Sequence, residues 1–239
     1  MNKRFEFYKY NILKYLDKNS KILVVGSGED DFNLFKNNKF TNFTCSNLGG
    51  KEINSNTFKQ LDINNINELD ESYDYVVAHA CIHHCSKPHN GILEMYRVAK
   101  KGVLVIESKD SFLMKLMIAV NFAEKYELSA ISSDDEFGDQ GGVDNTSIPN
   151  YIYRWTEHEI EKLVNSYNPR YKHIIDFNYR FNYENFLLKF NNKIINTFIQ
   201  FFLKLLMSAL QLIITKQGNL FSFFINKEES KKLKHHWIK

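Results

Sequence analysis

From Ser20 onward the chain alternates short apolar runs with stretches at helical spacing, and this alternation limits the possible folds most strongly. The runs typical of strands cover residues 21–25, 41–45, 57–61, 73–78, 102–107, 171–179 and 219–225. Strands that alternate with helices form βαβ units, whose right-handed crossovers place helices on both faces of a mainly parallel sheet. The sequence therefore predicts an α/β sheet with its ligand site beyond the carboxyl ends of the strands.

Apolar spacing and capping signals predict the helices. An amphipathic helix is expected over residues 5–16, and Thr156 and Glu159 form the pattern of a capping box at the start of a helix over 156–167. A helical stretch is also expected over 111–128, whereas the polar tail from 227 to 239 is expected to be loosely held. The first twenty residues carry charges throughout and lack the apolar core of an export signal.

Composition excludes several other classes of protein. The 239 residues suit one α/β domain, and 10 Gly with 3 Pro rule out a collagen-like chain. Lys and Arg number 31 against 28 Asp and Glu, without the clustered basic face typical of nucleic-acid binding, so no nucleic-acid partner is expected. Three cysteines are too few for a disulfide framework, which favours a cytoplasmic location.

Two short segments follow predicted strands and carry groups suited to a site. Gly26-Ser27-Gly28 comes directly after the first strand, where glycines let the backbone turn tightly and approach a ligand beside a helix N-terminus. A tight turn without a ligand is the alternative interpretation. The second segment follows the fourth strand and is rich in histidine and cysteine, with His79, Cys81, His83, His84, Cys85 and His89.

The spacing in the second segment argues against a metal site. Cys81 and Cys85 do not form a C-x₂-C pair, and the chain has no second cysteine pair to complete a tetrahedral site. No metal is therefore expected. His83 is expected to be a buried, hydrogen-bonded imidazole, whereas His84 and His79 are the better candidates to face a ligand.

With these segments in place, the chain resembles the class I S-adenosylmethionine-dependent methyltransferases, especially the type 11 small-molecule branch. The resemblance is clearest over 20–109, where residues 73–107 read as the family's fourth strand, its loop with a His-His pair, a helix and the fifth strand. It implies S-adenosylmethionine as cofactor. It also implies a Rossmann-like, doubly wound, mostly parallel seven-stranded sheet, with an antiparallel last strand and a helical insertion before it.

The resemblance also implies how the single domain over 1–239 is organised. Residues 1–19 form an N-terminal helix and 20–110 the cofactor-binding half. Residues 111–239 form the substrate half, with a lid over 129–155 and a helical insertion over 183–217.

Cofactor contacts are carried over from the family to matching positions. They are Gly26, Ser27, Gly28, Asn47, Asp62, Ile63, Ala78 and His79. Three positions depart from the family pattern: Val24 and Asn47 replace acids, and Asp30 replaces a glycine. These departures motivate the alternative of a degenerate cofactor-binding module without catalysis.

The expected reaction is methyl transfer to an oxygen or nitrogen of a small molecule, with a sugar or glycan precursor as one acceptor class. A neutral histidine could remove the acceptor's proton, and His84, or else His79, is the candidate. The lid offers polar and aromatic groups for substrate in Asp144, Asn145, Tyr153 and Arg154. A surface Ω-loop without a ligand is the competing interpretation of that segment.

A long apolar stretch covers residues 194–215. Lys204 is the only charge between 194 and 214, and the polar residues recur every three or four positions, so they form one stripe on a helix. The broad apolar face could pack in the core, in a homodimer or on a membrane surface. The membrane option includes an enzyme that acts on a lipid-linked acceptor.

Overall fold

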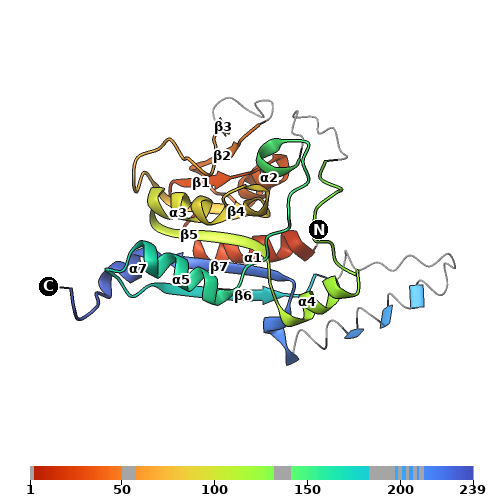
Figure 1. The fold of residues 1–239 in the computed structure, drawn as a ribbon. Coiled ribbons are helices and arrows are strands. Elements are labelled where there is room, and N and C mark those ends of the chain that lie inside the picture. The colour runs from red at the N-terminus through yellow and green to blue at the C-terminus, as the bar shows by residue number, and fades with distance from the viewer. Residues whose placement is uncertain are drawn as a thin grey trace.

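The computed structural model contains a seven-stranded sheet in the order β3-β2-β1-β4-β5-β7-β6 (Figure 1). The structure describes residues 3–49, 58–131, 141–182, 197–198, 201–202, 205–206, 209 and 213–238. The strands are β1 (Ile22–Val25), β2 (Phe43–Asn47), β3 (Phe58–Gln60), β4 (Tyr73–His79), β5 (Ala99–Ser108), β6 (Ile174–Arg180) and β7 (Leu220–Asn226). Neighbours from β3 to β5 pair in parallel, and β7 is antiparallel to both β5 and β6. The expected doubly wound sheet with an antiparallel last strand is confirmed.

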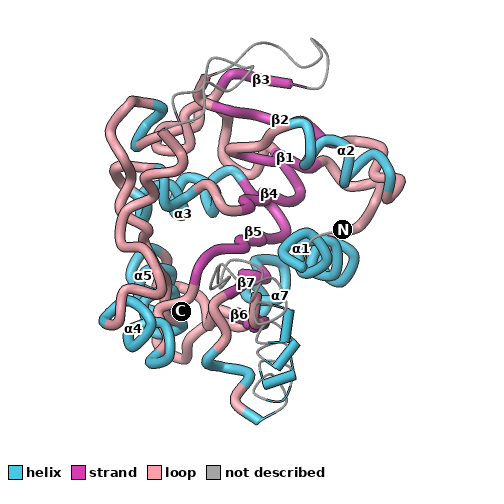
Figure 2. The backbone as a smooth tube through the Cα atoms, turned by 90° about the vertical axis from the view of Figure 1, so that its right-hand side faces the viewer, coloured by secondary structure: helices cyan, strands magenta, loops and turns pink. Residues whose placement is uncertain are grey.

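Helices cover both faces of this sheet (Figure 2). The described helices are α1 (Lys3–Tyr15), α2 (Glu29–Asn37), α3 (Pro88–Val98), α4 (Phe112–Ala119), α5 (Glu157–Tyr167) and α7 (Lys227–Lys232), with 3-10 turns η1 (Ile82–His84), η2 (Val143–Asn145) and η3 (Thr215–Gln217). Apolar residues of α1 and α2 form one buried cluster with the sheet, and those of α3 and α5 form the other. Alternating side chains of each central strand enter the two clusters, as a sheet buried on both faces requires.

Two helices differ from their expected form. The helix expected over 111–128 ends at Ala119, and Asn121 then adopts a φ of 60°, which a continuing helix does not allow. At α5, the Thr156 hydroxyl accepts the Glu159 N–H at 3.2 Å as expected. The Glu159 side chain does not complete the capping box, because its carboxylate accepts a hydrogen bond from Tyr153 and lies 2.8 Å from His89 Nε2.

The carboxyl-terminal segment is more ordered than the sequence suggested. Residues 227–232 form α7, and the Lys227 side chain is 4% exposed. Its ammonium donates to the carbonyl oxygens of Tyr96, at 2.7 Å, and Ala99, and burial lowers the pKa of Lys227 to about 8. The expectation of a loosely held tail is therefore wrong for this helix, because a lysine that caps carbonyls at the end of α3 anchors it.

The apolar stretch 194–215 lies mostly outside the described residues. Its described residues from 197 to 213 are helical, and their large apolar side chains are exposed: Phe198, Phe201, Phe202, Leu205, Leu206 and Ile213. These described side chains are therefore not part of the core. Within the described ranges, no helix combines the length and the apolar character needed to cross a bilayer.

Candidate functional site

A cavity of about 350 Å³ opens beyond the carboxyl ends of β1, β2, β3 and β4. This is the edge at which parallel α/β sheets bind their ligands. The predicted site residues in its lining are Gly26, Asn47, Asp62, Ile63, His84, Asp144 and Asn145. Residues from both halves of the chain therefore meet around one cavity, with strand ends on one side and the segment expected as a lid on the other.

Gly26 forms the sharp turn at the end of β1. Its φ is +57°, a conformation that residues with a side chain rarely adopt. A Cβ added here would lie 2.4 Å from the Cβ of Cys81 in the loop after β4. Glycine thus lets two loops pass close together at the cavity, and the Cys81 thiol donates to the Val25 carbonyl at 3.4 Å across the same contact.

Asn47 and Asp62 place polar groups at the ends of β2 and just beyond β3. The Asn47 side-chain oxygen accepts the Leu48 N–H at 2.8 Å, and one Asp62 oxygen accepts the Asn64 N–H at 2.8 Å. These local bonds fix both side chains at the cavity wall. Leu48 and Ile63 stand beside them in the lining and supply apolar surface. The wall therefore combines hydrogen-bonding groups for hydroxyls or amines with apolar side chains.

His84 also lines the cavity and lies in the turn η1. Its Nε2 is 3.5 Å from the Glu127 carboxylate, which also lines the cavity. Burial lowers the pKa of His84, and the neighbouring His83 lowers it further. The cavity wall thus contains the neutral imidazole of His84 next to the carboxylate of Glu127.

His83 is buried beneath this pair, as expected from the sequence. Its side chain is 5% exposed, and its Nδ1 lies 2.6 Å from the Glu107 carboxylate at the end of β5. Glu107 is fully buried and also accepts the Ile82 N–H at 2.8 Å. One carboxylate therefore holds both the backbone and the imidazole of the loop.

The described part of the expected lid reaches the same cavity. Gly141, Gly142, Asp144 and Asn145 are in its lining, and the Asp144 carboxylate accepts the Ser86 N–H at 3.0 Å. This bond ties the segment to the loop after β4. Residues 132–140, in the middle of the expected lid, lie outside the described residues.

Several residues expected to contact the cofactor do not line the cavity. Ala78 is fully buried within β4, and Ser27 is 1% exposed. The Ser27 hydroxyl accepts the Ser46 N–H at 2.9 Å and donates to the Val24 carbonyl at 3.1 Å, so it joins β1 to β2. Gly28 is the N-cap of α2, and the space around its Cα is open. Ala80, two residues past Ala78, lines the cavity instead.

His79 does not line the cavity. Its ring stacks on Tyr8 of α1 at 4.2 Å between centroids, and its Nδ1 is 3.6 Å from the Asp31 carboxylate of α2. Val77 packs in the cluster with α1 and α2, and alternation along β4 sends His79 toward the same face. Its position therefore does not support the expected role as a base, and His84 remains the candidate.

Tyr153 and Arg154 also lie outside the cavity lining. The Tyr153 hydroxyl donates to Glu159, and its ring packs 4.7 Å from that of Trp155. The Arg154 guanidinium donates to the Glu124 carbonyl at 2.7 Å. Both side chains hold the segment before α5 against its surroundings, so their position does not support the expected contact with substrate.

Glu127 is the functional candidate that the sequence did not reveal. It stands in the irregular segment after α4, where the Glu127 N–H donates to the Asn150 carbonyl at 3.0 Å. The sequence shows no motif around it, and the helix expected over 111–128 would have directed it elsewhere. The early end of α4 and the pairing of Tyr126 with Tyr151 bring it to His84.

The comparisons with known proteins agree with this geometry. Residues 24–106 match the type 11 family described as a methyltransferase domain. A structure of an S-adenosylmethionine-dependent methyltransferase from Thermotoga maritima is similar at 12% identity and a TM-score of 0.51, over 93% of this chain and 89% of that one. One from Archaeoglobus fulgidus is similar at 11% identity and a TM-score of 0.52, over 93% and 94%. At these identities the likeness shows the fold. The comparison with curated proteins finds no match.

A further similar structure is a chain from the complex between the Trm112 methyltransferase activator and a methyltransferase of Haloferax volcanii. It has 8% identity and a TM-score of 0.54, over 100% of this chain and 99% of that one. Together with the family match, the fold defines a class I enzyme domain. Residues 24–106 therefore match a methyltransferase domain, and S-adenosylmethionine is the cofactor that this match implies.

The residues present fit this cofactor. The tight turn at Gly26 leaves its backbone at the cavity wall, where a side chain would collide with Cys81. Asn47 and Asp62 line the cavity with groups that can form hydrogen bonds to hydroxyls or to an amine, and Ile63 adds apolar surface beside them. Of the three departures, Val24 is fully buried in β1 and Asp30 lies in the exposed first turn of α2. Neither one therefore occupies the cavity.

Proposed function

We propose that the chain transfers a methyl group to an oxygen or nitrogen of a small, hydroxylated molecule such as a sugar or glycan precursor. The observation that carries this proposal is a single cavity that Gly26 and Asp62 line together with His84, Glu127 and Asp144. A cofactor held beside Gly26 and Asp62 would leave the space beside His84, Glu127 and Asp144 for an acceptor, and this space is called the acceptor end of the cavity. The acceptor end is polar, which suits hydroxyl groups better than an apolar ligand.

Each group at the acceptor end has a part in the reaction. The bound cofactor supplies a methyl group on a sulfonium; the acceptor's lone pair bonds to that carbon as the sulfur–carbon bond breaks, and the sulfur keeps the bonding electrons. The acceptor must also lose a proton. His84 and Glu127 stand where they can assist that loss. Asp144 and Asn145 line the same cavity and would hold other hydroxyls of the acceptor and orient it.

The proposal is tested by release of S-adenosylhomocysteine with a panel of free monosaccharides and nucleotide sugars. We expect at least one acceptor to raise the release above the background without acceptor. The His84→Ala variant should lower that rate by about 10²–10⁴-fold, the range for loss of an acid–base group. The matched control is His89→Ala, which removes a histidine paired with Glu159 outside the cavity lining and should keep the rate.

Calorimetry separates this enzyme from a degenerate module. The proposed methyltransferase binds both S-adenosylmethionine and S-adenosylhomocysteine. Failure to bind either compound would contradict the proposal. Binding without release on any acceptor of the panel would contradict the sugar class and favour the module without catalysis.

We also propose that the stretch 194–215 contacts an anionic membrane surface. Its described apolar side chains are exposed, with Phe198 at 73% and Ile213 at 78%. The sequence has no acidic residue from Asn185 to Asn226 but contains Lys189, Lys193, Lys204 and Lys216. Exposed aromatic and aliphatic groups with lysines only are typical of helices that lie in the interface of anionic lipids.

Flotation with vesicles tests this contact. We expect the chain to float with vesicles that contain anionic phospholipid and to float less with neutral vesicles. Replacing Phe201 and Phe202 with Asp should abolish flotation, because both exposed rings lose their apolar contact. Leu69→Asp changes an 82% exposed leucine elsewhere and should leave it unchanged. Protein that stays in the soluble fraction and sediments as a dimer would contradict the proposal in favour of a homodimer.

A further inference from the structure

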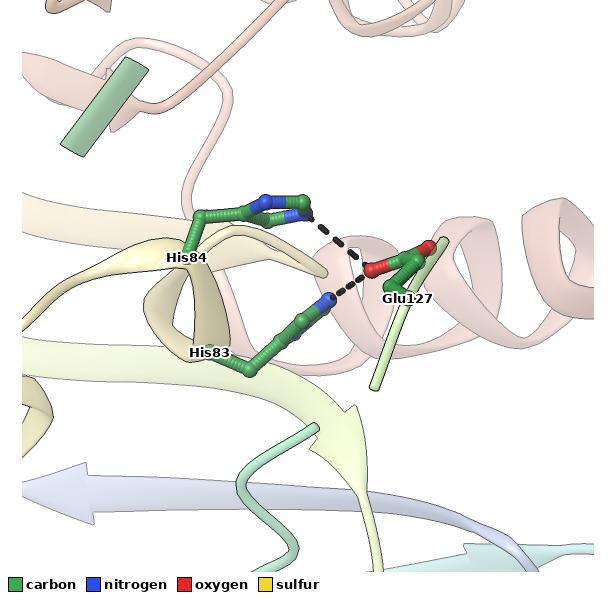
Figure 3. A group of neighbouring side chains, drawn as sticks. All are labelled: His83, His84 and Glu127. Atoms are coloured by element: carbon green, nitrogen blue, oxygen red, sulfur yellow. Dashed lines mark hydrogen bonds and ion pairs between the residues drawn. The ribbon is translucent and has the colours of Figure 1, made fainter. Parts of the chain in front are cut away.

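Three side chains at the acceptor end of the cavity converge on one point (Figure 3). The His–Glu cluster consists of His83, His84 and Glu127. A Glu127 carboxylate oxygen lies 3.2 Å from His83 Nε2 and 3.5 Å from His84 Nε2, and one ligand atom from each residue lies within 4.8 Å of the others. Atoms bound to one cation at about 2.0–2.2 Å lie roughly 3–3.6 Å apart. The cluster therefore has nearly the dimensions of a metal site, and small rotations of the rings would complete it.

Glu107 orients His83 toward this point. Its carboxylate, fully buried, lies 2.6 Å from His83 Nδ1 on the side away from Glu127. When Nδ1 carries the proton and donates it to Glu107, Nε2 keeps its lone pair and faces the cluster. A carboxylate that holds the second nitrogen of a histidine in this way is the common arrangement behind metal ligands. Asn150 supports the other ligand, since its amide donates to the Glu127 carboxylate at 3.3 Å.

The charges of the cluster favour a divalent cation. Two carboxylates, Glu107 and Glu127, surround two imidazoles with little exposure, His83 at 5% and His84 at 29%. Without a cation, His83 compensates these carboxylates as an imidazolium: burial alone would lower its pKa, but Glu107 and Glu127 raise it to about 9. A divalent cation would take the place of that proton. One divalent cation with both imidazoles neutral would balance the two negative charges.

We propose that the His–Glu cluster binds a divalent transition-metal cation such as Zn²⁺ and that the acceptor's oxygen occupies one of its open positions. Two imidazoles with one carboxylate favour such a cation over Mg²⁺ or Ca²⁺, which prefer oxygen ligands. A cation that binds a hydroxyl lowers its pKa, so the hydroxyl proton passes to solvent and the oxygen keeps the lone pair. The cation's role in the reaction rests on the proposed methyl transfer, and His84 takes part in it as a metal ligand. Binding of the cation to the His–Glu cluster does not depend on the proposed function.

This inference replaces the expectation of no metal. That expectation came from the cysteines, and their spacing was a sound reason to exclude a cysteine site. The Cys81 and Cys85 thiols donate to the carbonyl oxygens of Val25 and Cys81, at 3.4 and 3.9 Å. The third ligand is Glu127, which is distant in sequence from the histidine pair.

Titration of chelator-treated, purified chain with Zn²⁺ and Co²⁺ tests the site. We expect one equivalent to bind, with a visible Co²⁺ absorption spectrum that reports nitrogen and oxygen ligands. His84→Ala and Glu127→Ala should each weaken the affinity at least about tenfold, in line with loss of a ligand. His89→Ala is the matched control, because His89 also pairs with a glutamate, at 2.8 Å, and should leave the affinity unchanged. Circular dichroism confirms that each variant is folded.

The outcomes separate the cation site from the methyl transfer. Absence of stoichiometric Zn²⁺ or Co²⁺ binding, or binding that both cluster variants retain, would overturn the site and leave His83 as the bridge between two glutamates. Full release of S-adenosylhomocysteine by chelator-treated chain would overturn the cation's role in the reaction but support the transfer. Cation binding without release on any acceptor would support the site and contradict the transfer.

Discussion

Gly26→Ala is expected to destabilise the chain by about 2–5 kcal/mol and to weaken binding of S-adenosylmethionine by at least about tenfold. The φ of +57° costs a residue with a Cβ roughly 1–2 kcal/mol. The added methyl group would also lie 2.4 Å from the Cys81 Cβ, and overpacking of this kind costs a further 1–3 kcal/mol or so. The turn must shift to relieve the contact, and with it the cavity wall that the cofactor contacts.

Gly28→Ala is the matched control for this prediction. It lies two residues away in the same loop, but its φ of −117° suits any residue and a Cβ there meets no atom within 4 Å. Its stability should stay within about 0.5 kcal/mol of the original chain. Chemical denaturation measures both variants, and calorimetry measures the affinity for S-adenosylmethionine. Equal denaturation midpoints for the two variants would show that the turn at Gly26 is not the constrained position.

A double variant separates the two causes. Cys81→Gly removes the Cβ and the thiol that the new methyl group would meet. In the background of Cys81→Gly, the Gly26→Ala change should cost only the conformational part, about 1–2 kcal/mol. An undiminished cost in this background would mean that the backbone conformation alone explains the effect.

The sequence was a good guide to the parts of the site that follow directly from strands. Gly26, Asn47 and Asp62 each stand at or just after a predicted strand, and parallel strands bring their carboxyl ends to one edge. The positions of these three residues depend only on the order of residues along the chain and on the parallel pairing of the strands. The same reasoning correctly put the loop with His84 at that edge.

The expectations that the structure does not support concern side chains whose direction is decided by tertiary packing. His79 and Ala80 are adjacent, but only Ala80 lines the cavity, because His79 belongs to the face of β4 that α1 covers. The sequence does not tell which helix covers which face. Glu127 reaches the cavity only because α4 ends early and the following segment pairs with residues near Tyr151. The fold class can be predicted from the pattern of apolar runs alone, whereas the positions of these side chains depend on tertiary packing.

Glu107→Ala is expected to cost about 3–5 kcal/mol of stability. The carboxylate is fully buried and serves both the Ile82 N–H, at 2.8 Å, and His83 Nδ1, at 2.6 Å. Removing it leaves two buried groups without this partner, and breaking one side of a buried charged pair typically costs about this much. Glu127→Ala is the comparison, because its carboxylate is 31% exposed and solvent can replace the lost bonds. Urea denaturation should show a much smaller loss for it.

Glu107→Gln distinguishes a positioning role from a purely structural one. The amide oxygen can still accept the Ile82 N–H, while the amide NH₂ then faces His83 Nδ1 and favours the tautomer with the proton on Nε2. This change should keep most of the stability that Glu107→Ala loses. It should nevertheless weaken Co²⁺ binding at least about tenfold, because the Nε2 lone pair no longer faces the His–Glu cluster. Nitrogen chemical shifts of His83 report the tautomer directly. Normal Co²⁺ affinity in a folded Glu107→Gln chain with the altered tautomer would show that His83 is not a ligand, and that Glu107 serves the loop rather than the cation.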